Sequence, residues 1–288
     1  MTGTPSIEPT VDSAILERLN AKVAHPARVY DALLGGKDNF AADRETADAL
    51  LQASPRTVEA MRANRAFLDR AVTYLTAEEG ISQFLDIGTG LPTVNNTHEV
   101  AQRNAPESRV VYVDNDPMVL LHAQTMLTST KEGKTSYIDA DLREPAKIFS
   151  QAAGTLDFSQ PTAVILLAVL HFIPDADDPY RIVQTLVDAL APGSYLVISH
   201  VADDTTPEIG EIARRYNERV SSNGFPRSRA EGAGFFSGLD LVPPGLVPLP
   251  KWRPRSEPEA AAYPLGWAGV GKKSRLHQTQ LGPGVPRR

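Results

Sequence analysis

The stretch Phe84-Leu85-Asp86-Ile87-Gly88-Thr89-Gly90 decides the fold. A short apolar run leads directly into two glycines, a pattern typical of a buried strand that ends in a tight turn. Because glycine has no Cβ atom, a ligand can approach the backbone of such a turn closely. The stretch therefore predicts a strand with a binding site at its carboxyl end, although an ordinary strand-to-helix turn would need the same glycines.

Further apolar runs follow this stretch, and helical patterns lie between them. Strands are predicted over Arg109–Val113, Thr135–Asp139, Ala163–Leu170 and Ser194–Ser199, with a last edge strand over Leu265–Val270. The segment 239–247 contains Pro243-Pro244-Gly245 and is expected to be irregular. Strands that alternate with helices favour right-handed crossovers and a parallel sheet covered on both faces. The predicted fold class is therefore α/β.

The chain before this sheet has a different character, since no strand pattern stands out there. We predict an N-terminal helical cap over residues 1–80, a core over 81–273 and a mobile tail over 274–288. The tail is basic and contains proline and glycine, a composition that favours mobility over packing.

Composition narrows the class of protein. The chain has 288 residues, a net charge of −6 and no cysteine, which excludes a disulfide scaffold, a thiolate zinc site and a cysteine nucleophile. The acidic balance argues against a broad nucleic-acid surface. The longest apolar run, Ala163–Leu170, is far shorter than a membrane span, and Met1–Thr10 lacks a signal-peptide pattern. We expect a cytoplasmic protein with no nucleic-acid or membrane partner and no metal site, and the oligomeric state stays open.

Acidic residues stand at the predicted ends of three strands, where open parallel sheets bind their ligands. Asp114 comes 24 residues after Gly90 and can accept hydrogen bonds from both hydroxyls of a ribose. It could instead cap the next helix, since Asp116-Pro117 also resembles a helix start. Asp141, with Leu142 beside it, can accept from an adenine amino group, although a plain loop aspartate is the alternative.

The glycine turn departs from a dinucleotide-binding fingerprint. That fingerprint requires a third small residue where this chain has Thr93, and Pro92 stands where the helix would begin. The pattern describes a nucleoside site without a phosphate cradle, and S-adenosylmethionine fits such a site because it carries adenine and ribose but no phosphate. Asp86 would then help to hold its ammonium group, directly or through water.

Two resemblances make this interpretation more specific. The stretch 84–90, the acid Asp114 and the segment 190–199, with its Leu-Ala-Pro-Gly turn, resemble in this order the class I S-adenosylmethionine-dependent methyltransferases. A closer resemblance, to the S-adenosyl methyltransferase family formerly catalogued as a domain of unknown function, extends over residues 25–273. It is carried by Ala27–Phe40, Asp43-Arg44, Asn64–Leu68, Gln83–Thr93 and Val110–Asp116.

The resemblance implies a Rossmann-like fold with a seven-stranded, mostly parallel sheet, S-adenosylmethionine as cofactor and methyl transfer as activity. It supplies no acceptor, and we expect a small molecule. The residues expected to bind the cofactor are Asp86, Gly88, Gly90, Asp114, Asn115, Asp141 and Leu142. Two alternatives stay open: a non-catalytic protein that binds S-adenosylmethionine, and a nicotinamide-dependent oxidoreductase, which would need the missing third small residue.

Catalytic candidates come from histidines near the strand ends. His171 and His200 follow the fourth and fifth predicted strands, and either could act as a general base if the attacking atom carries a proton. Both could instead be structural, and His98 is a weaker candidate for the same cleft. Tyr30 and Asn39 lie in a polar segment with two glycines, which predicts a lid over the site or, alternatively, a hinge between cap and core.

Overall fold

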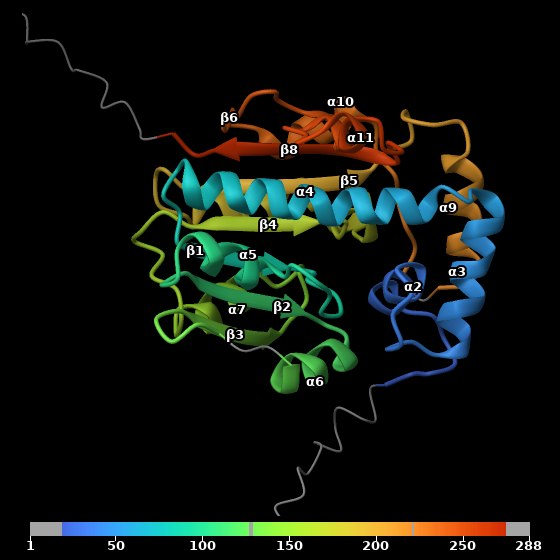
Figure 1. The fold of residues 1–288 in the computed structure, drawn as a ribbon, viewed down its shortest axis with the longest axis horizontal. Helices are drawn as coiled ribbons and strands as arrows, with labels where there is room; N and C mark the ends of the chain where they lie inside the picture. Colours follow the sequence, from blue (N-terminus) through green and yellow to red (C-terminus); the bar gives the residue numbers. More distant parts are fainter. Residues whose placement is uncertain (1–18, 127–128, 221, 275–288) are drawn as a thin grey trace, which may run out of the picture.

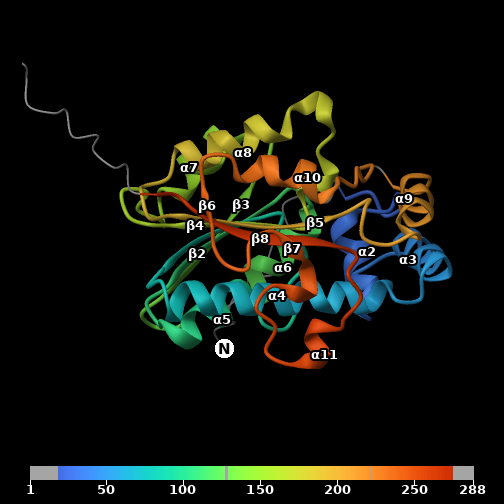
Figure 2. The same ribbon diagram turned by 90° about the horizontal axis from the view of Figure 1, so that it is seen from above.

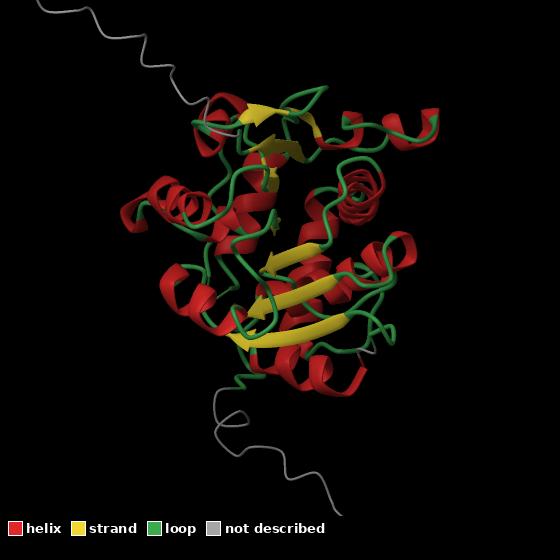
Figure 3. Cartoon of the chain, turned by 90° about the vertical axis from the view of Figure 1, so that its left-hand side faces the viewer, coloured by secondary structure: helices red, strands yellow, loops and turns green. Residues whose placement is uncertain are grey.

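The computed structural model of the chain describes residues 19–126, 129–220 and 222–274. One mixed sheet forms its centre, and helices cover both faces of that sheet (Figure 1; Figure 3). The strands are β1 (Gln83–Ile87), β2 (Arg109–Asp114), β3 (Lys134–Asp139), β4 (Ala163–Leu167), β5 (Tyr195–Val201), β6 (Asp240–Leu241), β7 (Val247–Pro248) and β8 (Gly266–Lys272). The α/β class predicted from the sequence is confirmed.

The order of the strands creates a place for a ligand. Along the sheet they run β3-β2-β1-β4-β5-β8-β6, and β7 also pairs with β8. The first five strands are parallel, whereas β8 runs antiparallel to β5, β6 and β7. The direction of winding reverses between β1 and β4, so the chain leaves these neighbours toward opposite sides and opens a crevice at their carboxyl ends.

The described sheet has eight strands, so the expectation of seven is wrong in number. Beside the six strands that the residue patterns predicted, the sheet contains two short strands, β6 within the segment that we expected to be irregular and β7 at its end, and both pair with β8. Backbone N–H and C=O groups along the edge of a sheet form hydrogen bonds wherever another segment lies beside them. A segment of only two residues is enough to form such a pairing. The predicted last strand is present as β8, but it lies inside the sheet, between β5 and β6.

The fourth strand is shorter than predicted. It ends at Leu167, Ala168 has a φ of 52°, and Leu170–Phe172 forms a 3-10 turn, η1. The amide of Ala168 turns to the neighbouring strand and donates to the Ser199 carbonyl at 3.0 Å. The turn after the strand is buried as well, as Leu170 shows, so the sequence stays apolar beyond Leu167. An apolar run alone therefore does not distinguish a buried strand from a buried turn.

Helices pack on the sheet in two layers. Figure 2 shows α4, α5 and α11 on one side and α7, α8 and α10 on the other. The helices are α2 (Pro26–Leu33), α3 (Ala41–Ala53), α4 (Thr57–Ala77), α5 (Thr97–Asn104), α6 (Pro117–Met126), α7 (Pro145–Ala152), α8 (Pro179–Asp188), α9 (Ile209–Asn217), α10 (Arg229–Gly232) and α11 (Glu257–Ala260). Further 3-10 turns are η2 (Asp175–Asp177), η3 (Ala233–Phe236) and η4 (Leu249–Lys251).

The two layers enclose separate apolar cores because side chains alternate across each strand. In β1, Leu85 and Ile87 belong to the core beneath α7 and α8, whereas Phe84 belongs to the core beneath α4. None of the helices within the described residues is long and apolar enough to cross a membrane.

A third core lies beyond the carboxyl ends of the strands. Helices α2, α3 and α9 gather there (Figure 1), and Val29, Leu50 and Ile212 pack together within it. Helix α4 reaches from this cluster to the sheet, where Phe67 and Leu75 are fully buried. The cap boundary at residue 80 stays a prediction, although part of α4 packs directly on the sheet. The expected tail lies outside the described residues, except for Ser274.

Candidate active site

A cavity of about 260 Å³ opens at the carboxyl ends of β1, β2 and β4 and extends between α2, α4 and α9. The structure brings most of the residues predicted for the site together in its lining. These are Asp86, Gly88, Gly90, Asp114, Asn115, Asp141, Leu142, Tyr30 and His171. The lining does not include Asn39, His200 or His98.

The glycine turn after β1 is fixed by two different constraints. Gly88 and Gly90 have φ values of 73° and 68°, a left-handed conformation that side chains disfavour. A Cβ atom on Gly88 would lie 2.4 Å from Val169 Cγ2, so this glycine is required for packing against the segment after β4. A Cβ atom on Gly90 would meet nothing within 4 Å, which leaves its backbone open to a ligand.

Asp114 links the glycine turn to the end of β2. One carboxylate oxygen accepts from the Gly90 amide at 2.8 Å, and the other accepts from the Asp116 amide at 2.9 Å. Burial raises the pKa of Asp114, and these two hydrogen bonds lower it in part. A carboxylate oxygen accepts more than one hydrogen bond, so both oxygens can still accept from a ligand. The structural and the ligand-binding interpretations of Asp114 are therefore compatible.

Asp86 is a buried carboxylate near the end of β1. The Thr97 hydroxyl donates to its Oδ2 atom at 2.6 Å. Burial raises the pKa of Asp86 to about 6, although the Thr97 hydrogen bond and the positive charge of Arg65 oppose the shift. A desolvated carboxylate of this kind is stabilised by a cation placed against it.

Asp141 and its neighbours form another part of the lining. The Nε and Nη2 atoms of Arg143 donate to its two carboxylate oxygens at 2.9 and 3.0 Å, and Asn115 Nδ2 donates at 3.3 Å. Burial raises the pKa of Asp141, but the hydrogen bonds and charge of Arg143 outweigh it and hold the pKa below its usual value. The adjacent Leu142 is 5% exposed and provides an apolar contact surface.

The two catalytic candidates differ in their surroundings. His171 lies in η1 and lines the cavity, and its buried Nδ1 atom has no hydrogen-bond partner among the described residues. Burial is the main cause that lowers the pKa of His171 well below its usual value, and the nearby His200 ring and the positive charge of Arg227 act in the same direction. The ring is therefore neutral, and its Nδ1 atom is available for a hydrogen bond with a ligand.

His200 lies within β5, which runs two residues beyond the predicted strand. Its ring stacks on Trp267 at 5.0 Å, Nδ1 contacts the Val201 carbonyl at 2.6 Å, and Nε2 lies 3.3 Å from Arg227 Nη1. Burial is the main cause that lowers the pKa of His200 to about 3. Both ring nitrogens are thus used within the protein. His98 also lies outside the cavity lining, and its Nδ1 atom lies 2.8 Å from the hydroxyl of a buried tyrosine.

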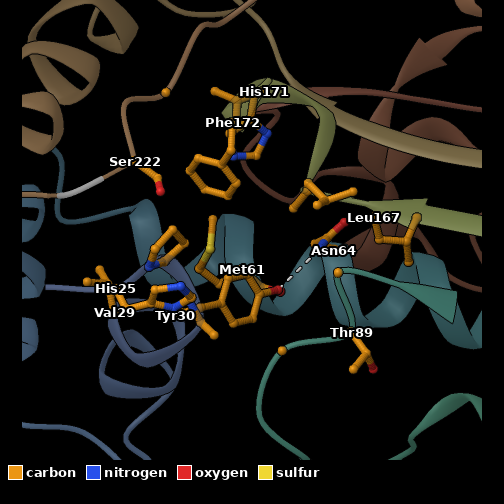
Figure 4. A pocket seen from close by; sticks show the side chains of 18 of the residues that line it. His25, Val29, Tyr30, Met61, Asn64, Thr89, Leu167, His171, Phe172 and Ser222 are labelled. Atoms are coloured by element: carbon orange, nitrogen blue, oxygen red, sulfur yellow. Dashed lines mark hydrogen bonds between the residues drawn. The ribbon is translucent and has the colours of Figure 1, made fainter. Parts of the chain in front are cut away.

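Of the two residues predicted for a lid, one lines the cavity and the other does not. Tyr30 lines the cavity, and its hydroxyl donates to the Met61 carbonyl at 3.0 Å and accepts from Asn64 Nδ2 at 3.2 Å (Figure 4). Asn39 lies outside the lining and donates to Asp31 Oδ2 at 2.8 Å, so it shapes the loop that follows α2. The lid role stays a prediction, with only Tyr30 placed to contact a ligand.

A buried chain of hydrogen bonds connects Tyr30 to the sheet. Asn64, which donates to the tyrosine, accepts from the Ser199 hydroxyl at 2.6 Å through its Oδ1 atom. Ser199 Oγ in turn accepts from the Ala168 amide at 3.1 Å. The chain thus fixes α2, α4 and the turn after β4 relative to one another at the cavity wall.

Sequence reasoning missed the apolar walls of the cavity. Met61 of α4, Phe172 of η1 and Ile212 and Tyr216 of α9 line it, and Figure 4 shows Met61 between Phe172 and Tyr30. The stripe on α9 has ordinary helical spacing and is indistinguishable from a core stripe in the sequence. Asn64 and its neighbour Arg65, in contrast, carried a signal, since they are polar residues within a motif of the family resemblance.

Comparisons with known proteins agree with this geometry. A family model described as S-adenosyl methyltransferase matches residues 12–274. A DUF574 family protein from Streptomyces avermitilis MA-4680 is 45% identical, with a TM-score of 0.85 over 88% of this chain and 98% of its own. A proposed methyltransferase from Thermobifida fusca YX is 42% identical, with a TM-score of 0.81 over 90% of this chain and 98% of its own. No curated protein matches.

The residues of the cavity fit the cofactor that this family uses. The buried carboxylate Asp86 forms no ion pair among the described residues, Gly90 leaves room for a ligand, and Asp114 retains the capacity to accept hydrogen bonds. The match over almost all of the sequence therefore places the chain in the S-adenosyl methyltransferase family, as an enzyme that uses S-adenosylmethionine as its methyl donor.

Proposed function

We propose that the enzyme transfers the methyl group to a small, uncharged and largely apolar molecule held between α2, α4 and α9. The observation that carries this proposal is the continuity of the cavity. One end is formed by the acids and glycines at the strand ends, and the other by apolar side chains of the cap. A donor and an acceptor can therefore meet inside one enclosed space.

The end of the cavity near the strands suits the donor. Asp114 would accept from the ribose hydroxyls, Asp141 and Leu142 would contact adenine, and Asp86 would face the ammonium group. Gly90 would allow close approach to the backbone. When bound, S-adenosylmethionine supplies an electrophilic methyl group on its sulfonium. The residues of this chain act by orienting the two reactants and by excluding water.

The end between the helices suits an uncharged acceptor. Its walls include Leu33, Ile209 and Ile212, and the charged side chains nearby already have partners. His25 Nδ1 lies 2.7 Å from Asp116 Oδ2, and Asp31 accepts from Asn39. A charged acceptor would lose its hydration there without gaining a counterion, which is unfavourable.

Two unpartnered polar atoms offer contacts for the reacting group of the acceptor. The Nδ1 atom of His171 and the hydroxyl of Tyr216 are buried, line the cavity and have no hydrogen-bond partner among the described residues. We propose His171 as the group that accepts a proton if the attacking atom carries one. His200 is not proposed for this role, because its ring is packed on Trp267 outside the lining.

Binding and turnover test the proposed function together. S-adenosylhomocysteine should bind with micromolar affinity, and at about 100 times its Kd it should stabilise the native state by about 2.7 kcal/mol. Thermal melts with this ligand and with NAD provide the measurement and its control. A shift with NAD alone would contradict the proposal. Binding without methyl transfer to any acceptor would instead support the non-catalytic alternative.

Asp114→Ala should reduce both cofactor affinity and stability, because the carboxylate serves a ligand and two backbone amides. We expect affinity for S-adenosylhomocysteine to fall roughly 30- to 1,000-fold and unfolding free energy to fall by about 1–3 kcal/mol. Calorimetric titration and denaturant unfolding measure the two effects. Ser228→Ala, which removes a helix cap outside the cavity lining, should cost about 1 kcal/mol and leave affinity unchanged. Unchanged affinity in Asp114→Ala would contradict the ribose contact.

The role of Asp86 predicts a pH dependence of cofactor binding. Without a ligand, burial raises the pKa of the Asp86 carboxyl group to about 6, so the group is ionised above that pH and neutral below it. If the ionised form holds the ammonium group, affinity should weaken as pH falls through 6, by about tenfold between pH 7 and pH 5. Titrations across this range measure the effect, and Asp86→Asn should remove it. The same pH dependence in Asp86→Asn would assign it to another group.

The uncharged acceptor is testable with matched compounds. Each pair shares one aromatic skeleton with a hydroxyl group, and one member carries an additional carboxylate. Mass spectrometry after incubation with S-adenosylmethionine should detect methylation of the neutral members, since the acceptor end between the helices offers the charged members no counterion. Methylation confined to the charged members would show that the proposed acceptor class is wrong.

A further inference from the structure

The cavity contains a cationic side chain that forms no ion pair among the residues that the structure describes. Arg65 of α4 lines the cavity near its donor end, together with the basic residues His25 and Arg143. Those two are paired, His25 with Asp116 at 2.7 Å and Arg143 with a carboxylate oxygen of Asp141 at 2.9 Å. Arg65 forms no ion pair with any carboxylate in the described part of the chain.

The guanidinium group of Arg65 is nevertheless held in place. Its Nη2 atom donates to the carbonyls of Val94 and Asn95, at 3.3 and 2.9 Å, in the loop that follows the glycine turn. The Nε atom is buried and has no hydrogen-bond partner among the described residues. A buried donor left without an acceptor is costly, and more so when it belongs to a charged group. The two carbonyl contacts thus fix the orientation of the guanidinium group, while its Nε–H donor remains available for a ligand.

Arg65 also acts on the buried carboxylate at this end of the cavity. Burial raises the pKa of Asp86 and the positive charge of Arg65 opposes that rise, so the two groups sense each other. They come from different elements, α4 and β1, and both line the cavity. A cation and an anion presented in this way are complementary to a ligand that carries both charges, such as the amino-acid part of S-adenosylmethionine.

We propose that Arg65 binds the carboxylate of the methionine part of the cofactor, while Asp86 faces the ammonium group. The assignment rests on the proposed function, because it takes the donor end of this cavity as the cofactor site. The donor has one anionic group, and Arg65 is the cationic residue of the lining that forms no ion pair within the described chain. A hydrogen bond that involves charged groups also gains strength in a desolvated site.

A purely structural role would give Arg65 only the two carbonyls of the loop. The two roles are separable, because a ligand without the amino-acid part still needs the loop but cannot use the cation. S-adenosylhomocysteine carries both charged groups, whereas 5′-methylthioadenosine retains adenine, ribose and a thioether and lacks them. The ratio of their affinities therefore isolates the contact with the amino-acid part.

The experiment measures both ligands by calorimetric titration on the full chain and on three variants. Arg65→Met keeps length and removes the charge, and Arg65→Lys keeps the charge and loses the planar donor edge. Arg103→Met is the matched control, because Arg103 Nη2 donates to the side chain of Asn95 at 2.9 Å in the same loop but lies outside the cavity lining.

We expect Arg65→Met to weaken S-adenosylhomocysteine roughly 10- to 100-fold and to change 5′-methylthioadenosine by no more than about twofold. Arg65→Lys should retain part of the affinity, and Arg103→Met should leave the ratio of the two ligands unchanged.

Equal weakening of both ligands by Arg65→Met would assign Arg65 to the loop alone and overturn the proposal. An unchanged affinity for S-adenosylhomocysteine would overturn it as well, and the proposed function would stand in both cases. If the unmodified chain bound neither ligand, the proposed function itself would fail, and the assignment of Arg65 with it.

Discussion

The packing of α4 against two separate cores is the constraint on which the site depends. With 21 residues this helix is about 30 Å long, enough to cover the sheet and still extend past the ends of the strands. Trp252 fixes the position of α4 on the sheet. Its indole ring packs edge-on against Phe67 at 5.3 Å, and the backbone carbonyl of Trp252 accepts from Arg70 Nε at 2.9 Å. The first turns of α4 are thereby held over the carboxyl ends, where Asn64 and its neighbours meet the cavity.

Polar contacts then fix the positions of the elements that surround the cavity. Asn64 receives the Ser199 hydroxyl from the sheet and donates to Tyr30 in the cap, so one amide side chain sets the distance between them. Asp114 performs a similar function on the donor side, because it ties the glycine turn to the end of β2. Each of these groups is satisfied within the protein, so the site is organised before a ligand binds, and little ordering remains for binding to accomplish.

The sequence locates the residues proposed for the donor side, which the cavity brings together, but not those proposed for the acceptor side, for a physical reason. Asp86 and Asp114 lie at the carboxyl ends of β1 and β2, and Gly90 lies in the turn after β1. A strand fixes where its last residues lie, so local pattern suffices. The wall from α9 depends on a helix more than 100 residues away in the chain meeting α2, which no local pattern encodes. Apolar periodicity also misplaced the end of β4, and it could not show that the ring of His200 turns onto Trp267.

The division of the cavity between chain segments has an evolutionary consequence. The residues proposed to contact the donor lie at the ends of the first three strands and in the turns after them, whereas those proposed to contact the acceptor come mainly from α2, α9 and the loop that follows α9. Under this assignment, substitutions in the second set leave the nucleoside contacts intact, so natural variation can alter which molecules are methylated at little risk to donor binding. Proteins with this architecture can therefore diversify in substrate range while retaining a common chemistry, and similarity among them is a better guide to the donor than to the acceptor.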